Sequence, residues 1–259
     1  MDLTFKNAPL NEVALGYTFL ARPDLLIPHI GKFWTEIDDQ YPKCQHAPPI
    51  FESSDQAAFA DLPLPRVWFI SDDDTRLVQI QQDRLTFNWR DRGTGQPYIR
   101  FPAIQEEFLR IDDLFRKFVL KETGLPISPS AYNLTYVNII KRGDGWTSYE
   151  DIHRVLPDMR WQGSGRFLLP PNHMEWKAVF PLPDEMGTLT ASVQPAKLIK
   201  DLSPILKFDL TAKSESLGGK EVLLNKWIQI AHTSVVQGFR DLTGEEMHEK
   251  FWLLEREND

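Results

Sequence analysis

The stretch RVWFISDDDTRLVQIQQDRLTFNWR, residues 66–90, decides the fold class of this chain. Three short runs rich in apolar residues, Arg66 to Ile70, Arg76 to Gln81 and Arg84 to Arg90, lie in this stretch, and apolar and polar residues alternate along the last of them. Such alternation is typical of strands with one buried face. Polar segments that favour tight turns separate the runs, among them Asp72 to Asp74. We therefore predict three consecutive antiparallel strands.

The elements on either side of these strands complete a unit of five elements. Alternation predicts a strand over 12–19, and apolar spacings of three and four predict a helix over 28–41. The proline-rich segment 42–65 is typical of an irregular connection. A long amphipathic helix, ending near residue 123, follows the three strands. The order is strand, helix, three strands, helix.

The same order of elements then begins again. The start of its first strand and the end of its last helix are displaced by the same number of residues from those of the first set. We therefore expect a duplication, with a first repeat over 1–125 and a second over 126–259, fused as one compact body. The second set comprises a strand over 131–140, a short helical stretch over 149–156, strands over 176–180, 189–193 and 206–210, and a helix over 220–242.

These elements predict an α+β fold with a mainly antiparallel, curved sheet and the long helices on one face. The expected arrangement is similar to the TATA-binding-like and helix-grip folds. A fold of this kind does not define a function.

Composition narrows the class of protein. The chain has 259 residues, 42% of them hydrophobic and 25% charged, which is typical of a globular protein. Cys44 is the only cysteine, so no internal disulfide is expected. The first ten residues lack the features of a secretion signal, and no run is long enough to span a membrane, so we expect a cytoplasmic protein. The net charge of −8 disfavours general nucleic-acid binding.

Searches for catalytic motifs give no candidate. The pair His248-Glu249 begins like a zinc-protease motif, but residue 252 is Trp, so we expect the end of a surface helix there. Cys44 and His46 lie in the segment predicted to be irregular, which does not place a base beside a thiol. The acids Asp112-Asp113 are expected on a solvated helix face. No catalytic residue, metal or cofactor is predicted.

Two groups of residues are candidates for binding. Polar side chains cluster on neighbouring strands and could line a ligand or partner surface, although an ordinary solvent-facing side of the sheet is the favoured explanation, because antiparallel sheets commonly leave one face in water. Tryptophans expected to be exposed could form a partner surface. The first group is Gln79, Gln81, Arg84, Asn88, Arg90, Asn133, Thr135 and Asn138, and the second is Trp146, Trp161 and Trp252.

Four stretches together resemble a sporadically distributed bacterial family of about this length. They are Asn7-Ala8-Pro9-Leu10 with Glu12-Val13; Leu77 to Arg84 with Asn88-Trp89-Arg90; Thr135 to Asn138; and a C-terminal helix with Ala231-His232, Phe239, Leu242-Thr243 and Met247-His248-Glu249. Ile139-Ile140 departs from the family pattern, where a more polar segment is expected. The resemblance implies no established activity, catalytic residue or cofactor; its patchy distribution suggests an accessory role in a defence or toxin–antitoxin system.

The leading functional hypothesis is a non-catalytic protein-binding module that uses the sheet face or the acidic C-terminal segment. The alternative is a small-molecule or nucleotide sensor with a pocket between the sheet and a long helix, anchored by Arg84, Asn88 and Arg90. An enzyme of unrecognised type is a third hypothesis. The sequence is also compatible with a homo-oligomer.

Overall fold

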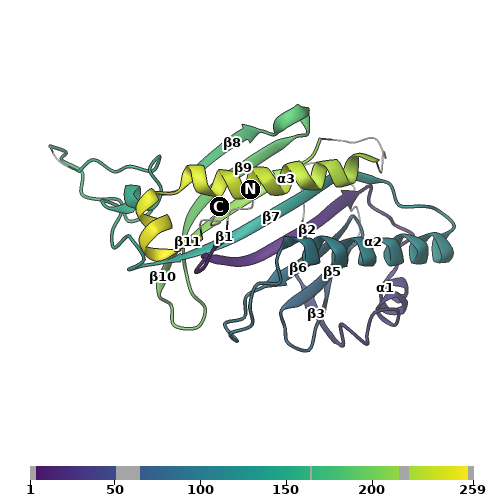
Figure 1. Cartoon of the computed structure of the whole chain (residues 1–259). Coiled ribbons are helices and arrows are strands. Elements are labelled where there is room, and N and C mark those ends of the chain that lie inside the picture. Colours follow the sequence, from purple (N-terminus) through teal and green to yellow (C-terminus); the bar gives the residue numbers. More distant parts are fainter. Residues whose placement is uncertain (1–3, 51–64, 164, 216–221, 256–259) are drawn as a thin grey trace. The chain divides into compact units, whose positions relative to one another are not determined.

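The computed structural model of the chain describes residues 4–50, 65–163, 165–215 and 222–255 (Figure 1). Its elements are β1 (Thr4–Phe5), β2 (Leu10–Phe19), α1 (Ile27–Trp34), β3 (Lys43–Ala47), β4 (Arg66–Ile70), β5 (Arg76–Gln81), β6 (Arg84–Arg90), α2 (Phe101–Thr123), β7 (Pro129–Lys141), η1 (Ile152–Arg154), β8 (Trp176–Pro181), η2 (Pro183–Glu185), β9 (Thr188–Lys197), β10 (Pro204–Lys213), α3 (Val222–Leu242), η3 (Met247–Phe251) and β11 (Leu254–Glu255).

The strands form a large antiparallel sheet, which confirms the predicted α+β class. Nine strands are hydrogen-bonded in the order β3-β4-β5-β6-β2-β7-β10-β9-β8, and β1 pairs with β11. The three strands predicted from residues 66–90 are β4, β5 and β6, with the predicted bounds. The duplication and the similarity to TATA-binding-like and helix-grip folds stay predictions.

The described residues fall into two compact units. Unit 1 comprises 4–11, 135–163, 165–213 and 225–255, and unit 2 comprises 12–50, 65–134, 214–215 and 222–224. Each unit therefore takes segments from both sides of residue 125. The duplication, with repeats over 1–125 and 126–259, stays a prediction.

In unit 2, α2 covers one face of β2 and β6. Tyr17 of β2 meets Phe108 of α2 with ring centroids 6.2 Å apart, and Tyr17 pairs with Leu85 of β6 in the sheet register. All three side chains are fully buried. The helix is capped by Gly124, whose φ of 74° is readily adopted only by glycine and whose N–H donates to Leu120 O at 2.9 Å.

In unit 1, α3 covers the strand pair β9 and β10. Trp227, buried as its spacing predicts, donates its indole N–H to Met186 O at 3.1 Å. Phe239 stacks on Phe208 of β10 with centroids 6.0 Å apart. Of the predicted helix over 220–242, residues 220 and 221 lie outside the described residues.

Three local predictions are wrong. Helix α1 ends at Trp34 rather than near residue 41, and turns follow it before Pro42. Part of the connection expected to be irregular is the strand β3, which pairs with β4, while residues 51–64 lie outside the described residues. Asp112 is buried rather than solvated, and Arg116 Nε donates to its carboxylate at 2.7 Å, which compensates the buried charge.

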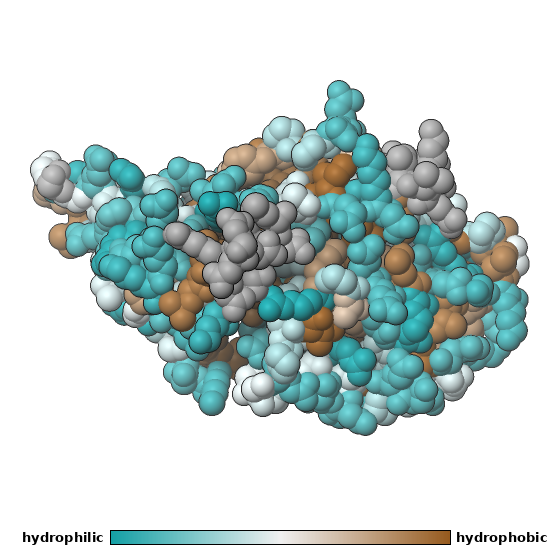
Figure 2. Space-filling view, in the orientation of Figure 1, coloured by the Kyte–Doolittle hydropathy of each residue, from teal (hydrophilic) through white to brown (hydrophobic). Residues whose placement is uncertain are grey.

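No helix among the described residues combines the length and the apolar character needed to cross a bilayer. On the face drawn in Figure 2, hydrophilic residues predominate and hydrophobic ones are scattered among them.

Candidate functional site

The polar residues of β5 and β6 lie on the face of unit 2 that α2 does not cover. Leu85 is on the α2 side, because its register partner Tyr17 contacts Phe108. Arg84 pairs with Thr18, the next residue of β2, so its side chain lies on the opposite side. Asn88 and Arg90 follow Arg84 with a period of two and share its face. A pocket between sheet and α2 anchored by these residues, as the sensor hypothesis expects, is therefore wrong.

A chain of side-chain hydrogen bonds crosses four adjacent strands on this face. Trp68 Nε1 of β4 donates to Gln79 Oε1 of β5 at 2.9 Å, and Gln79 Nε2 donates to Asn88 Oδ1 of β6 at 2.6 Å. Asn88 Nδ2 in turn donates to Glu12 Oε1 of β2. We call these four residues the polar relay. Every link points the same way, from an indole that can only donate to a carboxylate that accepts.

The central relay residues are buried, so this is not an ordinary solvated side of the sheet. Asn88 is 1% exposed and Gln79 is 7% exposed. Buried amides are costly unless both of their ends are bonded, and the relay bonds both ends of each. The solvent-facing explanation of these residues is therefore wrong.

Two arginines lie against the indole at the start of the relay. The guanidinium carbon of Arg66 is 5.2 Å from the Trp68 ring centroid, and that of Arg90 is 5.6 Å from it. The Nε atoms of Arg66 and Arg90 are buried without a hydrogen-bond partner among the described residues. Burial, followed by the charge of a neighbouring arginine, lowers the pKa of each: Arg84 acts on Arg66, and Arg92 on Arg90. We call Arg66, Trp68 and Arg90 the arginine–tryptophan cluster.

The other two predicted residues of these strands have internal partners. Arg84 forms a two-bond ion pair with Asp83, at 3.0 and 2.7 Å, and both side chains are largely buried. Gln81 holds the backbone of Ile50, accepting from its N–H at 2.9 Å and donating to its carbonyl at 3.0 Å. The polar groups of both side chains are therefore used in contacts within the chain.

The predicted residues of β7 do not form one surface. Asn133 and Asn138 are an odd number of positions apart, so they lie on opposite faces of the strand. Asn138, 3% exposed, donates to Phe208 O at 3.2 Å within unit 1. Thr135 bonds Thr211 at 3.0 Å in the same unit, whereas Asn133 belongs to unit 2. The alternation of side chains along a strand, which can be read from the sequence, already places Asn133 and Asn138 on opposite faces.

The tryptophans expected on the surface are mostly internal. Trp146 is 6% exposed and Trp252 is 3% exposed, so the exposure predicted for them is wrong. Trp252 packs on Phe239 with centroids 5.0 Å apart, because the chain after α3 folds back over it. Trp161 is half-buried, with the Arg166 guanidinium 4.7 Å from its ring. Instead, three consecutive apolar residues that the sequence analysis did not single out are exposed in unit 1: Phe167, Leu168 and Leu169.

His248 is buried rather than at a surface helix end. The centroid of its ring lies 5.4 Å from that of Phe5 and 5.9 Å from that of Trp252. Thr243 Oγ1 gives its single hydrogen to Phe239 O at 2.5 Å, so at 2.7 Å it accepts from His248 Nε2. The imidazole thus ties the chain after α3 to the N-terminal strand. The acidic end of the chain beyond residue 255 lies outside the described residues.

Cys44 and His46 line an apolar cavity of about 270 Å³ between α1 and β3, together with Trp34 and Phe69. Their shared side of β3 was not expected, because the segment was predicted to be irregular. Burial raises the pKa of the Cys44 thiol, which opposes formation of a thiolate. The cavity is separate from the arginine–tryptophan cluster. No three His, Cys, Asp or Glu side chains of the described residues gather as potential metal ligands.

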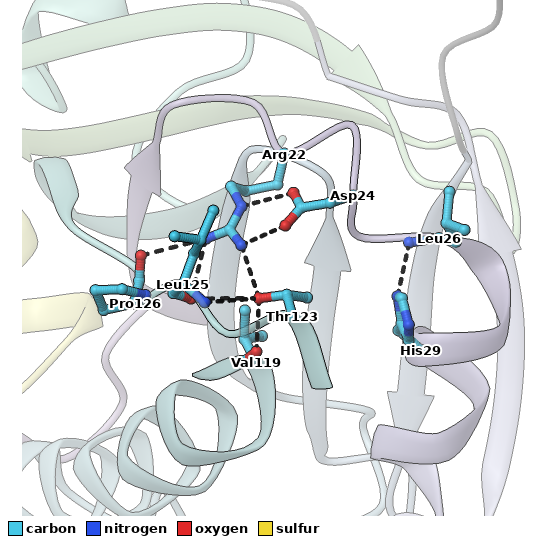
Figure 3. Close-up of polar contacts among 8 residues, drawn as sticks. All are labelled: Arg22, Asp24, Leu26, His29, Val119, Thr123, Leu125 and Pro126. Carbon is cyan, nitrogen blue, oxygen red and sulfur yellow. Dashed lines mark hydrogen bonds and ion pairs between the residues drawn. The ribbon is translucent and has the colours of Figure 1, made fainter. Parts of the chain in front are cut away.

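Arg22, another residue that the sequence analysis did not single out, joins the segment after β2 to the end of α2 (Figure 3). Its guanidinium binds both oxygens of Asp24, the Thr123 hydroxyl at 2.8 Å and the carbonyls of Leu125 and Pro126 at 3.4 and 3.2 Å. A cation is favourable beside the carbonyls at a helix C-terminus. Arg22 therefore holds the scaffold of unit 2.

No family model and no curated protein matches this chain. Among solved structures, it is similar to the di-domain ARO/CYC StfQ from the steffimycin biosynthetic pathway, with 9% sequence identity over 88% of this chain and 96% of that one. The TM-score is 0.21, too low for the likeness to support an argument about fold or function.

Proposed function

We propose that the chain is a protein-binding module, and that the arginine–tryptophan cluster of unit 2 binds an acidic segment of a partner protein. The observation that carries the proposal is the position of two guanidinium groups, on Arg66 and Arg90, at 5.2 and 5.6 Å from one indole ring. Arginine and tryptophan are the residue types enriched where binding energy concentrates in protein interfaces.

The charges around the cluster favour an anionic group. Arg84 is already paired with Asp83, and one nitrogen of Arg90 donates to Asp74 O at 3.3 Å. Arg66 and Arg90 both lie in the field of Glu12. That carboxylate also accepts the last bond of the polar relay. A further carboxylate would pair with guanidinium groups that are partly desolvated, where charge-assisted hydrogen bonds are strongest.

The dimensions of the face favour a segment of polypeptide. The cluster extends from β4 to β6, which corresponds to about 10 Å at the usual spacing of strands. An extended segment of about three residues covers the same distance. The apolar cavity between α1 and β3, which has the concave shape that suits a small molecule, is lined by other residues.

A nucleotide or another phosphate compound is the second candidate, because guanidinium groups bind phosphate and an indole stacks on a base. An accessory role in a bacterial defence or toxin–antitoxin system, which the sequence resemblance suggests, stays a prediction.

Binding of labelled acidic peptides to the full chain, followed by fluorescence anisotropy, tests the proposal. Glutamate-rich peptides should bind more tightly than matched glutamine-rich ones, and the double variant Arg66→Gln/Arg90→Gln should weaken binding by about tenfold or more. The control Lys117→Gln/Lys121→Gln changes the net charge equally on the exposed face of α2 and should leave binding unchanged.

Two results would contradict the proposal: equal binding of both peptides, or equal losses in the double variant and its control. Nucleotide binding that depends on Arg66 and Arg90, without acidic-peptide binding, would establish the second candidate instead. Thermal shifts with nucleotides distinguish it, since a ligand at 100 times its dissociation constant stabilises by about 2.7 kcal/mol.

A further inference from the structure

Strand β8 is the last strand of the sheet that the described residues form, and it pairs with β9 on one side only (Figure 1). A strand in this position presents backbone N–H and C=O groups to any extended chain of matching shape. Its sequence, Trp176-Lys-Ala-Val-Phe-Pro181, carries a single charge, on Lys177. Such an edge is weakly protected against pairing.

The register identifies the backbone groups at the free edge. Leu182 N donates to Gly187 O at 2.8 Å, which continues the β8–β9 register. In antiparallel pairs, successive residues point their backbone groups to alternate sides. Even-numbered residues of β8 therefore face β9, and the N–H and C=O groups of Lys177 and Val179 point away from it. Pro181 offers only its carbonyl on that side.

The side chains of β8 leave the apolar layer of unit 1 open at this edge. Ala178 and Phe180 pair with Ala191 and Leu189 of β9, which are buried. Paired residues share a face, so Phe180 continues this apolar layer, yet it is 37% exposed. Val179, on the other face, is 57% exposed.

We propose that β8 pairs antiparallel with β8 of a second copy of this chain, with Val179 on the two-fold axis. This register lets the two Val179 residues exchange both of their hydrogen bonds. In this register, Lys177 N–H donates to the carbonyl of the partner subunit's Pro181. Proline is tolerated at that position because it has no N–H group but still accepts through its carbonyl. The register also places the small Ala178 beside the partner subunit's Phe180, which covers that ring.

The charges permit this pairing. In the register with Val179 on the axis, the two Lys177 side chains are about 13 Å apart along the strands, since each residue advances the strand by about 3.3 Å. That separation exceeds the Debye length of about 8 Å at physiological ionic strength. The register is therefore free of a like-charge contact between the only charged residues of the strand. The two copies need no other partner to complete the edge.

Sedimentation velocity of the full chain over a wide range of concentration tests the proposal, with dimers expected. Val179→Pro removes an outward N–H that β9 does not use, so it should keep the fold and raise the dimer dissociation constant by about a hundredfold or more. Val179→Thr keeps the N–H and should stay dimeric. Circular dichroism of both variants should match that of the parent chain.

Cross-linking tests the register. In a Cys44→Ser background, Val179→Cys should form an intermolecular disulfide under mild oxidation, since facing Cα atoms about 5.5 Å apart suit that bond. The matched variant Lys177→Cys should not, because its two sulfurs would be about 13 Å apart along the strands. A chain that is monomeric throughout, a folded Val179→Pro variant that still dimerises, or equal cross-linking at both positions would each overturn the proposal.

Discussion

Gln79 and Asn88 are joined by a side-chain hydrogen bond across β5 and β6, with Nε2 donating to Oδ1 at 2.6 Å. The ends of the polar relay fix the direction of this bond. Trp68 can only donate, so Gln79 turns its oxygen toward the indole, and Glu12 accepts, so Asn88 turns its nitrogen toward the carboxylate. Reversing either amide would break bonds on both of its sides.

The variant Asn88→Asp should be strongly destabilised at neutral pH. One oxygen of the new carboxylate would still accept from Gln79, but the other would face the Glu12 carboxylate as a like charge. We expect a loss of about 2 kcal/mol or more in the free energy of unfolding. Repulsion raises the folded-state pKa of the carboxylate pair. The stability is therefore regained below the unfolded pKa of about 4 and lost as pH rises through the folded value.

Urea unfolding of Asn88→Asp at pH 4 and pH 7 measures this effect. The deficit relative to the parent chain should shrink at the lower pH, and Asn7→Asp, at an exposed position, should show no comparable deficit. A deficit that is independent of pH would show that the two carboxylates do not meet.

Removing the Arg22 side chain should loosen the end of α2. Arg22→Met loses hydrogen bonds to Asp24 and Thr123 and to two carbonyls, and bonds to charged groups are typically worth about 1.5–3 kcal/mol. We expect a loss of about 2 kcal/mol in the free energy of unfolding. In the control Lys32→Met, the removed side chain is 61% exposed, so a change below about 0.5 kcal/mol is expected. Equal effects of the two variants would contradict the assigned role.

His248 should make the chain less stable in acid. Burial, followed by the charge of Arg240, lowers the pKa of this imidazole from its usual 6.5. Its contribution is therefore fully present above 6.5 and is lost as pH falls through the folded value. His248→Gln should show a smaller change of unfolding midpoint between about pH 7 and pH 5 than the parent chain. His153→Gln, which replaces an exposed imidazole, should keep the parent slope; an unchanged slope in His248→Gln would contradict the prediction.

Glu246 should contribute to stability only above acidic pH. Hydrogen bonds from Arg154, followed by one from Lys250, lower the pKa of this carboxyl to about 2 from an ordinary value of 4.5. Stability from this pairing is present above 4.5 and is lost as pH falls through the folded value of about 2. Glu246→Gln should flatten that part of the stability profile, measured as the urea midpoint. Glu245→Gln should retain the slope, and a steep profile in both would remove Glu246 as its cause.

The exposed apolar residues of unit 1 should not contribute to folding. Phe167, Leu168 and Leu169 have exposed fractions of 101%, 68% and 84%, so replacing all three by serine should change the free energy of unfolding by less than about 0.5 kcal/mol. Phe208→Ala, at a fully buried position, should cost about 3–5 kcal/mol. A large loss in the serine variant would show that these residues are covered in the folded chain.

Local sequence patterns were sufficient to predict much of this fold. The apolar runs and turn residues over 66–90 defined three strands with their observed bounds, and the alternation over 84–90 placed Arg84 and Asn88 on the face opposite Leu85. The helical spacing around Trp227 and Phe239 identified the buried side of α3. These features follow from the periods of strand and helix, which any short segment carries in its own sequence.

Only the tertiary structure decided which polar residues are buried and what they bind. The amides of Gln79 and Asn88 are buried and oriented by Trp68 and Glu12, which approach them from other strands. His248 is buried because Phe5, from the far end of the sequence, packs against it. Alternation tells which side of a strand a residue occupies, but burial and hydrogen-bond partners depend on segments that are distant in sequence. Those contacts form only when the whole chain folds.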